Sequence, residues 1–323
     1  MVNNDQDRDI HVLRYFSSFI SVSRGKVINI TDPKIEFCPL ASYLYKDFKT
    51  VDMTDKEALK CEIKKAIESK IRDFGLFTPG RIFASENISI PYGASEMLMF
   101  ALHKKGIDAA VVVCDGAGTI ITESGKIVQA IGARMNSLLV TSPIKEIRDH
   151  LKLAGCCLIS DIASIDQIRG VERAIQSGYK RIAVTVCGHD SDKFKAIRKL
   201  ESSGISITIL SVCTTGISQA NAQEIKDYAD IVWSCASLDI RRTIGPEALL
   251  QISKQIPVFI LTKRGIDFVS SYAENSIFLR RLDKRKQYLI SNQASGQRIK
   301  IGNRIAYLRR VRPPVLSKEI FAL

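Results

Sequence analysis

Residues 182–213 read IAVTVCGHDSDKFKAIRKLESSGISITILSVC, and their pattern recurs through most of the chain. Residues 182–187 and 205–213 are short runs rich in β-branched side chains, which favour strands. Between them, residues 192–202 have the apolar spacing of a helix, and Gly204 supplies the left-handed residue that commonly follows a helix end. A strand, a helix and a second strand of these lengths predict one unit of a parallel sheet.

The same alternation extends in both directions from this unit. Further β-branched runs occupy residues 109–114, 138–141, 231–235 and 258–262, and further helical stretches occupy residues 144–153, 168–177, 219–228 and 247–254. We therefore expect an α/β fold with a doubly wound, mostly parallel sheet over residues 106–274.

Two smaller regions flank this core. In the N-terminal region, residues 19–30 alternate around a turn at Arg24-Gly25 and predict a β-hairpin. Residues 55–72 carry an apolar helical stripe, and residues 94–105 predict a second helix. Residues 1–105 thus form an N-terminal hairpin and helix lobe, and residues 275–323 form a basic C-terminal extension.

The extension holds twelve Lys and Arg against two acidic residues, so most of the net charge of +13 lies there. Its apolar positions alternate with cations, and tyrosines are sparse. This mixture favours an acidic protein partner over nucleic acid, which is bound with more aromatic side chains. We expect the extension to be a docking element that is not part of the fold.

Composition points to a globular cytoplasmic protein. Hydrophobic residues make up 46% and charged residues 25%, which is ordinary for a folded domain. No apolar run reaches the roughly 18 residues of a membrane span. The first nine residues are polar and acidic, unlike a secretory signal. The eight cysteines include no C-x-x-C pair, so they are expected to be reduced.

Cysteine follows the predicted strands at Cys114, Cys187, Cys213 and Cys235. Parallel strands end on the same edge of a sheet, where α/β proteins bind ligands. Cys114, Cys213 and Cys235 are therefore expected to end neighbouring strands and to face one crevice, where they could share a metal or cluster. Cysteine is also a common small buried filler at such positions, and that alternative stays open.

Hydroxyl-rich and glycine-rich loops follow the same strands. Thr214-Thr215-Gly216 and Thr141-Ser142-Pro143 each precede a predicted helix, where hydroxyls and backbone N–H groups can bind an anion or simply cap the helix. Asp115-Gly116-Ala117-Gly118 follows a strand but precedes another extended run, so a dinucleotide site is not supported. We interpret it as a tight turn that exposes Asp115.

The chain holds, in this order, the segments Ile35-Glu36-Phe37-Cys38-Pro39-Leu40, Ile71-Arg72-Asp73-Phe74-Gly75, Val113-Cys114-Asp115-Gly116-Ala117-Gly118-Thr119, Thr141-Ser142-Pro143-Ile144, Thr214-Thr215-Gly216 and Cys235-Ala236-Ser237. Together these segments resemble the methanogenesis marker protein 8 family of methane-producing archaea. The resemblance ends near Gly265. It implies an anaerobic cytosol and an accessory role in assembling, modifying or activating methyl-coenzyme M reductase, which would then be the acidic partner.

The resemblance also implies which thiols matter. Cys38, Cys114 and Cys235 lie inside the matching segments, with Cys213 as a further candidate, and three thiolates can hold an iron–sulfur cluster. Two other functions stay open. One is a small-molecule enzyme that binds a phosphorylated or carboxylated metabolite at the sheet edge, and the other is nucleic-acid binding through the basic extension.

Overall fold

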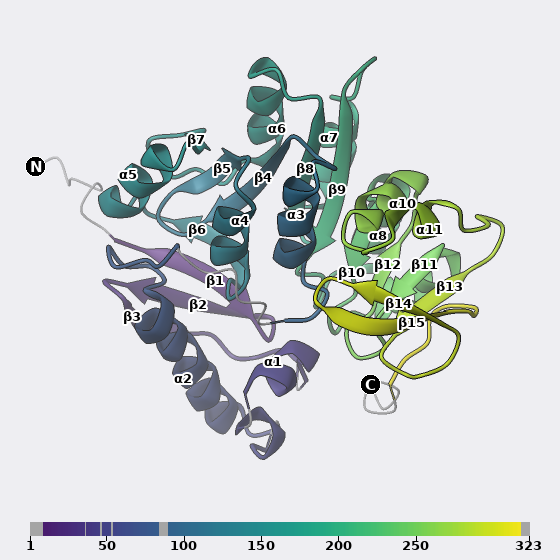
Figure 1. Cartoon of the computed structure of the whole chain (residues 1–323). Coiled ribbons are helices and arrows are strands. Elements are labelled where there is room, and N and C mark those ends of the chain that lie inside the picture. Colours follow the sequence, from purple (N-terminus) through teal and green to yellow (C-terminus); the bar gives the residue numbers. More distant parts are fainter. Residues whose placement is uncertain (1–8, 36, 46, 53, 84–89, 318–323) are drawn as a thin grey trace, which may run out of the picture.

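The computed structural model describes residues 9–35, 37–45, 47–52, 54–83 and 90–317, which form an 11-stranded sheet and a 4-stranded sheet (Figure 1). The strands are β1 (His11–Tyr15), β2 (Ser18–Ser23), β3 (Lys26–Ile30), β4 (Ala109–Cys114), β5 (Gly118–Thr122), β6 (Ser137–Thr141), β7 (Cys157–Leu158), β8 (Arg181–Cys187), β9 (Ser206–Val212), β10 (Ile231–Trp233), β11 (Leu250–Ile252), β12 (Val258–Ile260), β13 (Tyr288–Ser291), β14 (Gln297–Ile301) and β15 (Arg304–Arg310). The helices are α1 (Pro39–Leu44), α2 (Lys56–Phe74), α3 (Ala94–His103), α4 (Gly125–Gly132), α5 (Lys145–Leu153), α6 (Gln167–Gln176), α7 (Ser191–Arg198), α8 (Gln219–Tyr228), α9 (Leu238–Thr243), α10 (Lys263–Ser270) and α11 (Ser276–Arg280), with short 3-10 turns η2 (Asp47–Lys49) and η3 (Gly245–Glu247).

The α/β class is confirmed, and parallel pairing holds at the centre of the large sheet. There β4, β8, β9 and β10 lie side by side and run parallel. Strands farther out are mostly antiparallel: β5 and β7 beyond β4, and β12 beyond β10. The predicted helix over residues 247–254 is wrong, because η3 and the buried strand β11 occupy that segment.

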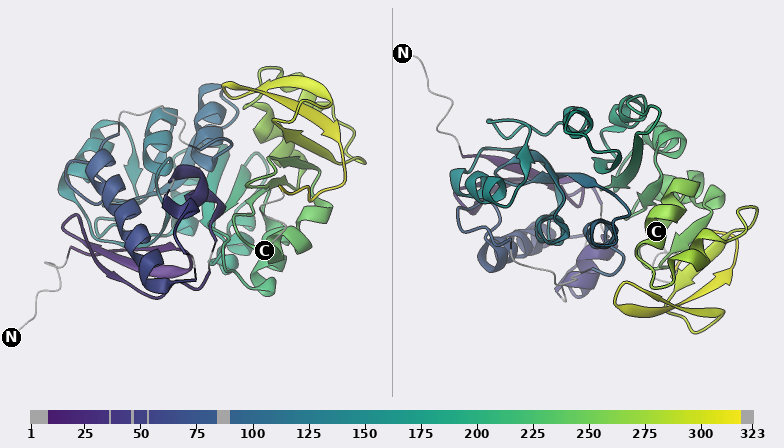
Figure 2. Two further views of the ribbon diagram at one scale, coloured as in Figure 1. Left: turned by 90° about the horizontal axis from the view of Figure 1, so that it is seen from below. Right: turned by 45° about the horizontal axis from the view of Figure 1, so that its top comes forward.

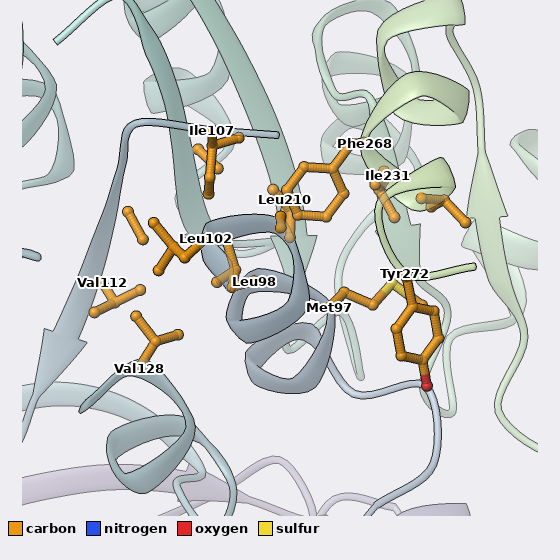
Figure 3. Packing of buried hydrophobic residues seen from close by; sticks show 14 of the residues in the cluster. Met97, Leu98, Leu102, Ile107, Val112, Val128, Leu210, Ile231, Phe268 and Tyr272 are labelled. Atoms are coloured by element: carbon orange, nitrogen blue, oxygen red, sulfur yellow. The ribbon is translucent and has the colours of Figure 1, made fainter. Parts of the chain in front are cut away.

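Helices cover both faces of the large sheet, as in a doubly wound fold. Successive side chains of a strand point to opposite faces, so Val112 packs in one core cluster with α3 and α4 while Val111 packs in the other with α6 and α7. Figure 3 shows Leu98 and Leu102 of α3 beside Val112 and Val128. Within the described ranges, no helix combines the length and apolar character needed to cross a membrane.

The small sheet has the order β3-β2-β1-β6 and forms the N-terminal lobe together with α2. The predicted hairpin and helix are confirmed, since β2 pairs with β3 and Asp55 caps α2 by accepting hydrogen bonds from two backbone N–H groups. Residues 138–141 were expected in the large parallel sheet. They lie instead in β6, which pairs antiparallel with β1.

The basic extension is part of the large sheet, so the expectation that it lies outside the fold is wrong. β13 pairs parallel with β11, and β15 pairs with both β13 and β14. Leu289 and Ile290 are fully buried, and Arg304 forms an ion pair with the buried Glu96 of α3 at 3.1 Å. Figure 2 shows these strands, in yellow, on the side of the molecule away from β1–β3. The division of the chain at residue 105 stays a prediction.

Candidate functional site

A cavity of about 270 Å³ lies at the carboxyl ends of β8, β9 and β10. The strand ends form one wall through Cys187, Val212 and Trp233. The other walls are the turn between β1 and β2, the start of α1, the start of α3 and the end of α4. The cavity therefore lies between the N-terminal lobe and the large sheet, at the edge where an α/β sheet is expected to bind ligands.

Most of the lining is apolar, and thiols interrupt it. Apolar lining residues include Leu98, Val113, Val128, Ile131, Leu138 and Trp233. The cysteines in the lining are Cys38, Cys187, Cys213 and Cys235. An apolar concave surface with a few convergent polar groups is the usual character of a small-molecule site.

Two of these cysteines have a strained backbone. Cys213 has a φ of 56° directly after β9, and Cys235 has a φ of 45° two residues after β10. Non-glycine residues seldom adopt this left-handed conformation, and such residues gather at functional sites. This left-handed conformation turns the chain away from the strand direction at each cysteine, where the cysteine borders the cavity.

The cavity thiols are protonated at neutral pH. Burial raises the pKa of Cys38 to about 11 and the pKa of Cys213 well above its ordinary value. Burial also raises the pKa values of Cys187 and Cys235. Cys187 Sγ lies 3.3 Å from the Ser137 hydroxyl, which gives it a polar partner. In this state the thiols are small polarizable wall groups, not thiolate nucleophiles.

His189 lies on the loop after β8 and holds the neighbouring loop. Its Nε2 donates to the Thr215 carbonyl at 2.9 Å, because a carbonyl can only accept. Burial lowers the pKa of His189, and the nearby positive charge of Arg14 lowers it further. The imidazole is therefore neutral at physiological pH and ties the loops after β8 and β9 together.

Of the residues predicted to bind a ligand through hydroxyls, Thr215 lines the cavity. The others make internal bonds: Thr214 donates to the Trp233 carbonyl, Thr141 accepts from Gly116 N, and Ser142 bonds the backbone of Ile10. Ser142 does not cap α5 as expected, because the cap position is Ile144. Gly216 adopts a φ of 75° in the loop after β9, outside the cavity lining.

Asp115 is fully buried, so the expectation that its turn exposes it is wrong. Its carboxylate accepts from Arg81 Nε at 3.1 Å and from Phe77 N at 2.7 Å. The turn itself is confirmed, since β4 and β5 pair as a hairpin around Gly116 and Gly118. A Cβ on Gly118 would lie 2.3 Å from the Ala163 carbonyl oxygen, so this position requires glycine for packing.

The predicted metal ligands do not form one set. Cys38, Cys213 and Cys235 border the cavity, whereas Cys114 is buried beside Asp115, where burial raises its pKa strongly. Among the described residues, no group of three or more His, Cys, Asp or Glu side chains is arranged to hold a metal ion. The iron–sulfur centre expected on Cys38, Cys114 and Cys235, with Cys213 as a further candidate, stays a prediction.

Arg14 and Ser17 line the cavity but were not predicted from the sequence, and Cys187 was not among the predicted site residues. Arg14 and Ser17 belong to the β1–β2 hairpin, which packs against the carboxyl ends of β8 and β9 across a gap of about 170 residues in sequence. A cation at one position of an alternating strand is an ordinary surface pattern. Cys187 ends a predicted strand, and that was the one signal available for this residue.

The fold and the cavity define an α/β protein with a thiol-lined cavity at the carboxyl ends of its central parallel strands. The chain belongs to the family described as uncharacterized protein conserved in archaea (DUF2099), whose model matches residues 11–274. It is 38% identical over 269 residues to the uncharacterized protein MJ0054 of Methanocaldococcus jannaschii, covering 83% of this chain and 92% of that relative. No solved structure gives a significant match.

Proposed function

We propose that this chain is a cytoplasmic accessory protein of methanogenesis that assists the assembly, modification or activation of methyl-coenzyme M reductase. In this proposal its working site is the cysteine-lined cavity, which binds a small molecule. Membership in an archaeal family, a relative from Methanocaldococcus jannaschii and the resemblance to methanogenesis marker protein 8 support the biological setting. All eight cysteines are free, which suits a reducing compartment.

The observation that carries the proposal is the cavity itself. It is mostly apolar and lies where Cys213 and Cys235, both with a left-handed backbone, follow adjacent parallel strands. An apolar hollow with a few convergent polar groups, at this edge of an α/β sheet, is the usual character of a small-molecule site.

The exposed cations of the extension support an acidic protein partner. They are Arg280, Arg281, Lys284, Arg285, Arg298, Lys300, Arg310 and Arg312. They lie on α11, on β14, on β15 and on the connecting segments; Asp283 pairs with Arg285 and Lys286, and Glu274 pairs with Lys300. Such a surface attracts a partner of opposite charge and raises its association rate at low salt.

Anaerobic isolation of the tagged protein from a methanogenic host tests the proposal. After denaturation, mass spectrometry identifies any released compound, and iron and acid-labile sulfide are assayed in parallel. We expect one compound in near-stoichiometric amount from wild type, together with co-purified reductase subunits. Iron and sulfide in place of that compound would favour the cluster alternative.

A matched pair of variants shows whether the compound occupies the cavity. Val212→Phe places a ring into the lining, whereas Val140→Phe changes an exposed side chain of β6 that lies outside the lining. We expect the first variant to lose the compound and the second to retain it. Equal retention by both variants, or wild type without any bound compound, would contradict the cavity proposal.

A further inference from the structure

Two buried polar atoms in the cavity wall have no hydrogen-bond partner within the part of the chain that the structure describes. They are Nη1 of Arg14, near the end of β1, and Oγ of Ser17, in the tight turn between β1 and β2. The guanidinium also lies over the Phe19 ring, 5.1 Å from its centroid. Neither contact with Phe19 nor the turn itself satisfies these polar atoms.

Such unpaired groups are costly in a folded protein. Burying a donor without a partner costs about 1–3 kcal/mol, and more when the group is charged. Native structures contain few of them, and each one calls for an explanation such as a bound ligand. Two on one turn, facing one cavity, indicate that a polar group of a ligand completes them.

The charges around Arg14 show which kind of group fits. Among the described residues, Arg14 has no ion-pair partner. The side chains that respond to its charge are Cys187, His189 and Cys213, whose burial keeps them neutral. Asp190 also acts on Cys187 and His189, but its carboxylate pairs with Lys193 at 2.8 Å. A guanidinium without an ion-pair partner attracts an anion, and its planar fork suits carboxylate or phosphate oxygens.

The position of Ser17 is set by the loop after β9. A Cβ on Gly216 would lie 2.5 Å from Ser17 Oγ, so the hairpin turn packs directly on this glycine. Phe16 and Ser17 both have positive φ values, of 51° and 52°, which is the geometry of a tight hairpin turn. The turn thereby holds Arg14 and Ser17 against the strand ends instead of leaving them in solvent.

We propose that the cavity ligand is an amphipathic anion, whose carboxylate or phosphate group binds Arg14 and Ser17 while its apolar body fills the rest of the cavity. This inference rests on the proposed function, because it requires that the cavity binds a small molecule. The cavity of about 270 Å³ is close to the lower end of the roughly 300–1,000 Å³ found for small-molecule pockets, so a small ligand is expected. Octanoate has a suitable size and shape.

Binding is measured by the fluorescence of Trp233, the chain's one tryptophan, which lines the cavity. The probes are octanoate, hexyl phosphate and octan-1-ol, which share an alkyl body and differ in their head groups. We expect wild type to bind at least one anionic probe about tenfold or more tighter than octan-1-ol, because a charge-assisted contact is added. The preference between the two anions distinguishes carboxylate from phosphate recognition.

Arg14→Met is expected to reduce anion binding to the level of octan-1-ol while leaving octan-1-ol binding unchanged. Arg24→Met, which changes an exposed arginine of the neighbouring hairpin, is the matched control and should keep the preference. Thermal unfolding of each variant shows that the fold is intact. If octan-1-ol binds wild type as tightly as the anions do, or if Arg14→Met keeps the preference, the anion inference is overturned and the cavity proposal stands. If none of the probes binds wild type, the cavity proposal and this inference fail together.

Discussion

Lys70 of α2 is buried behind the cavity wall, where an ionised ammonium group is unfavourable. Its ammonium group donates to Asn136 and lies 5.4 Å from the centroid of the Tyr15 ring. Burial, and secondly the positive charge of Arg134, lower the pKa of Lys70 from 10.5 to about 7. The helical stripe of α2 predicts that this face packs inward, but the stripe does not predict a titrating amine there.

Replacing Lys70 by Met should change how stability depends on pH. Between about pH 7 and pH 10.5 the unfolded chain binds a proton at Lys70 that the folded chain does not, so the free energy of unfolding rises with pH. Relative to Lys70→Met, wild type should gain about 2 kcal/mol between about pH 7 and pH 9. Urea unfolding at both pH values measures this. Lys64→Met, at an exposed site on the same helix, should show the same pH dependence of the free energy of unfolding as wild type. If this free energy changes equally with pH in wild type and in Lys70→Met, Lys70 is charged in the fold.

At the scale of elements, the β4–β5 hairpin depends on one buried ion pair. Arg81 and Asp115 are almost fully buried, and Arg81 also donates to the Ala130 and Ile82 carbonyls at 2.9 Å. Removing one partner leaves the other charge buried and unpaired. The pair therefore attaches the loop before α3 and the end of α4 to the end of β4.

Arg81→Met should lower the free energy of unfolding by about 3–5 kcal/mol, and the double variant Arg81→Met with Asp115→Asn should recover part of this loss. Equilibrium urea unfolding provides the measurement. Arg72→Met breaks an exposed pair with Asp73 and should cost no more than about 1 kcal/mol. Similar small costs for Arg81→Met and Arg72→Met would mean that the buried pair is not structural.

Elements with strong periodicity were predicted correctly, and elements whose identity depends on partners were not. The stripe of α2 and the strand-helix-strand unit around β8 and β9 have enough residues to express a period. Residues 247–254 are too short for that distinction, and β11 forms because β12 and β13 lie on both sides of it. Similarly, alternation in β6 fits either sheet, and pairing with β1 decides which one.

For the whole molecule, deletion of residues 275–323 should cause aggregation or a much lower melting temperature. The deletion removes β13 to β15, exposes the edge of β11 and removes the ion pair between Arg304 and Glu96. Exposed strand edges favour aggregation. Circular dichroism melting and size-exclusion chromatography of the truncated chain measure both effects, and a truncated chain that stays monomeric and melts like wild type would contradict this expectation.

The extension has a role in the fold and a proposed role in partner binding. Variants that remove charge without removing the strands distinguish these two roles. Arg280→Gln with Arg281→Gln changes exposed cations of α11 and the residue after it, and should leave the melting temperature unchanged. If the exposed cations of the extension bind an acidic partner, co-purification of reductase subunits should weaken in this variant and in wild type at higher salt. Unchanged co-purification would place the partner elsewhere.

Local sequence patterns were enough to predict the α/β class, the strand and helix alternation of the core and the cysteines at strand ends. These follow from local periodicity and from the rule that parallel strands end on one edge. Tertiary contacts were needed to show that β6 belongs to the small sheet, that the extension joins the large one, and that Cys114 lies outside the cavity lined by Cys38, Cys213 and Cys235. Pairing partners and side-chain burial depend on residues far apart in the chain. For the same reason, only packing of the N-terminal hairpin on the strand ends brings Arg14 and Ser17 to the thiols.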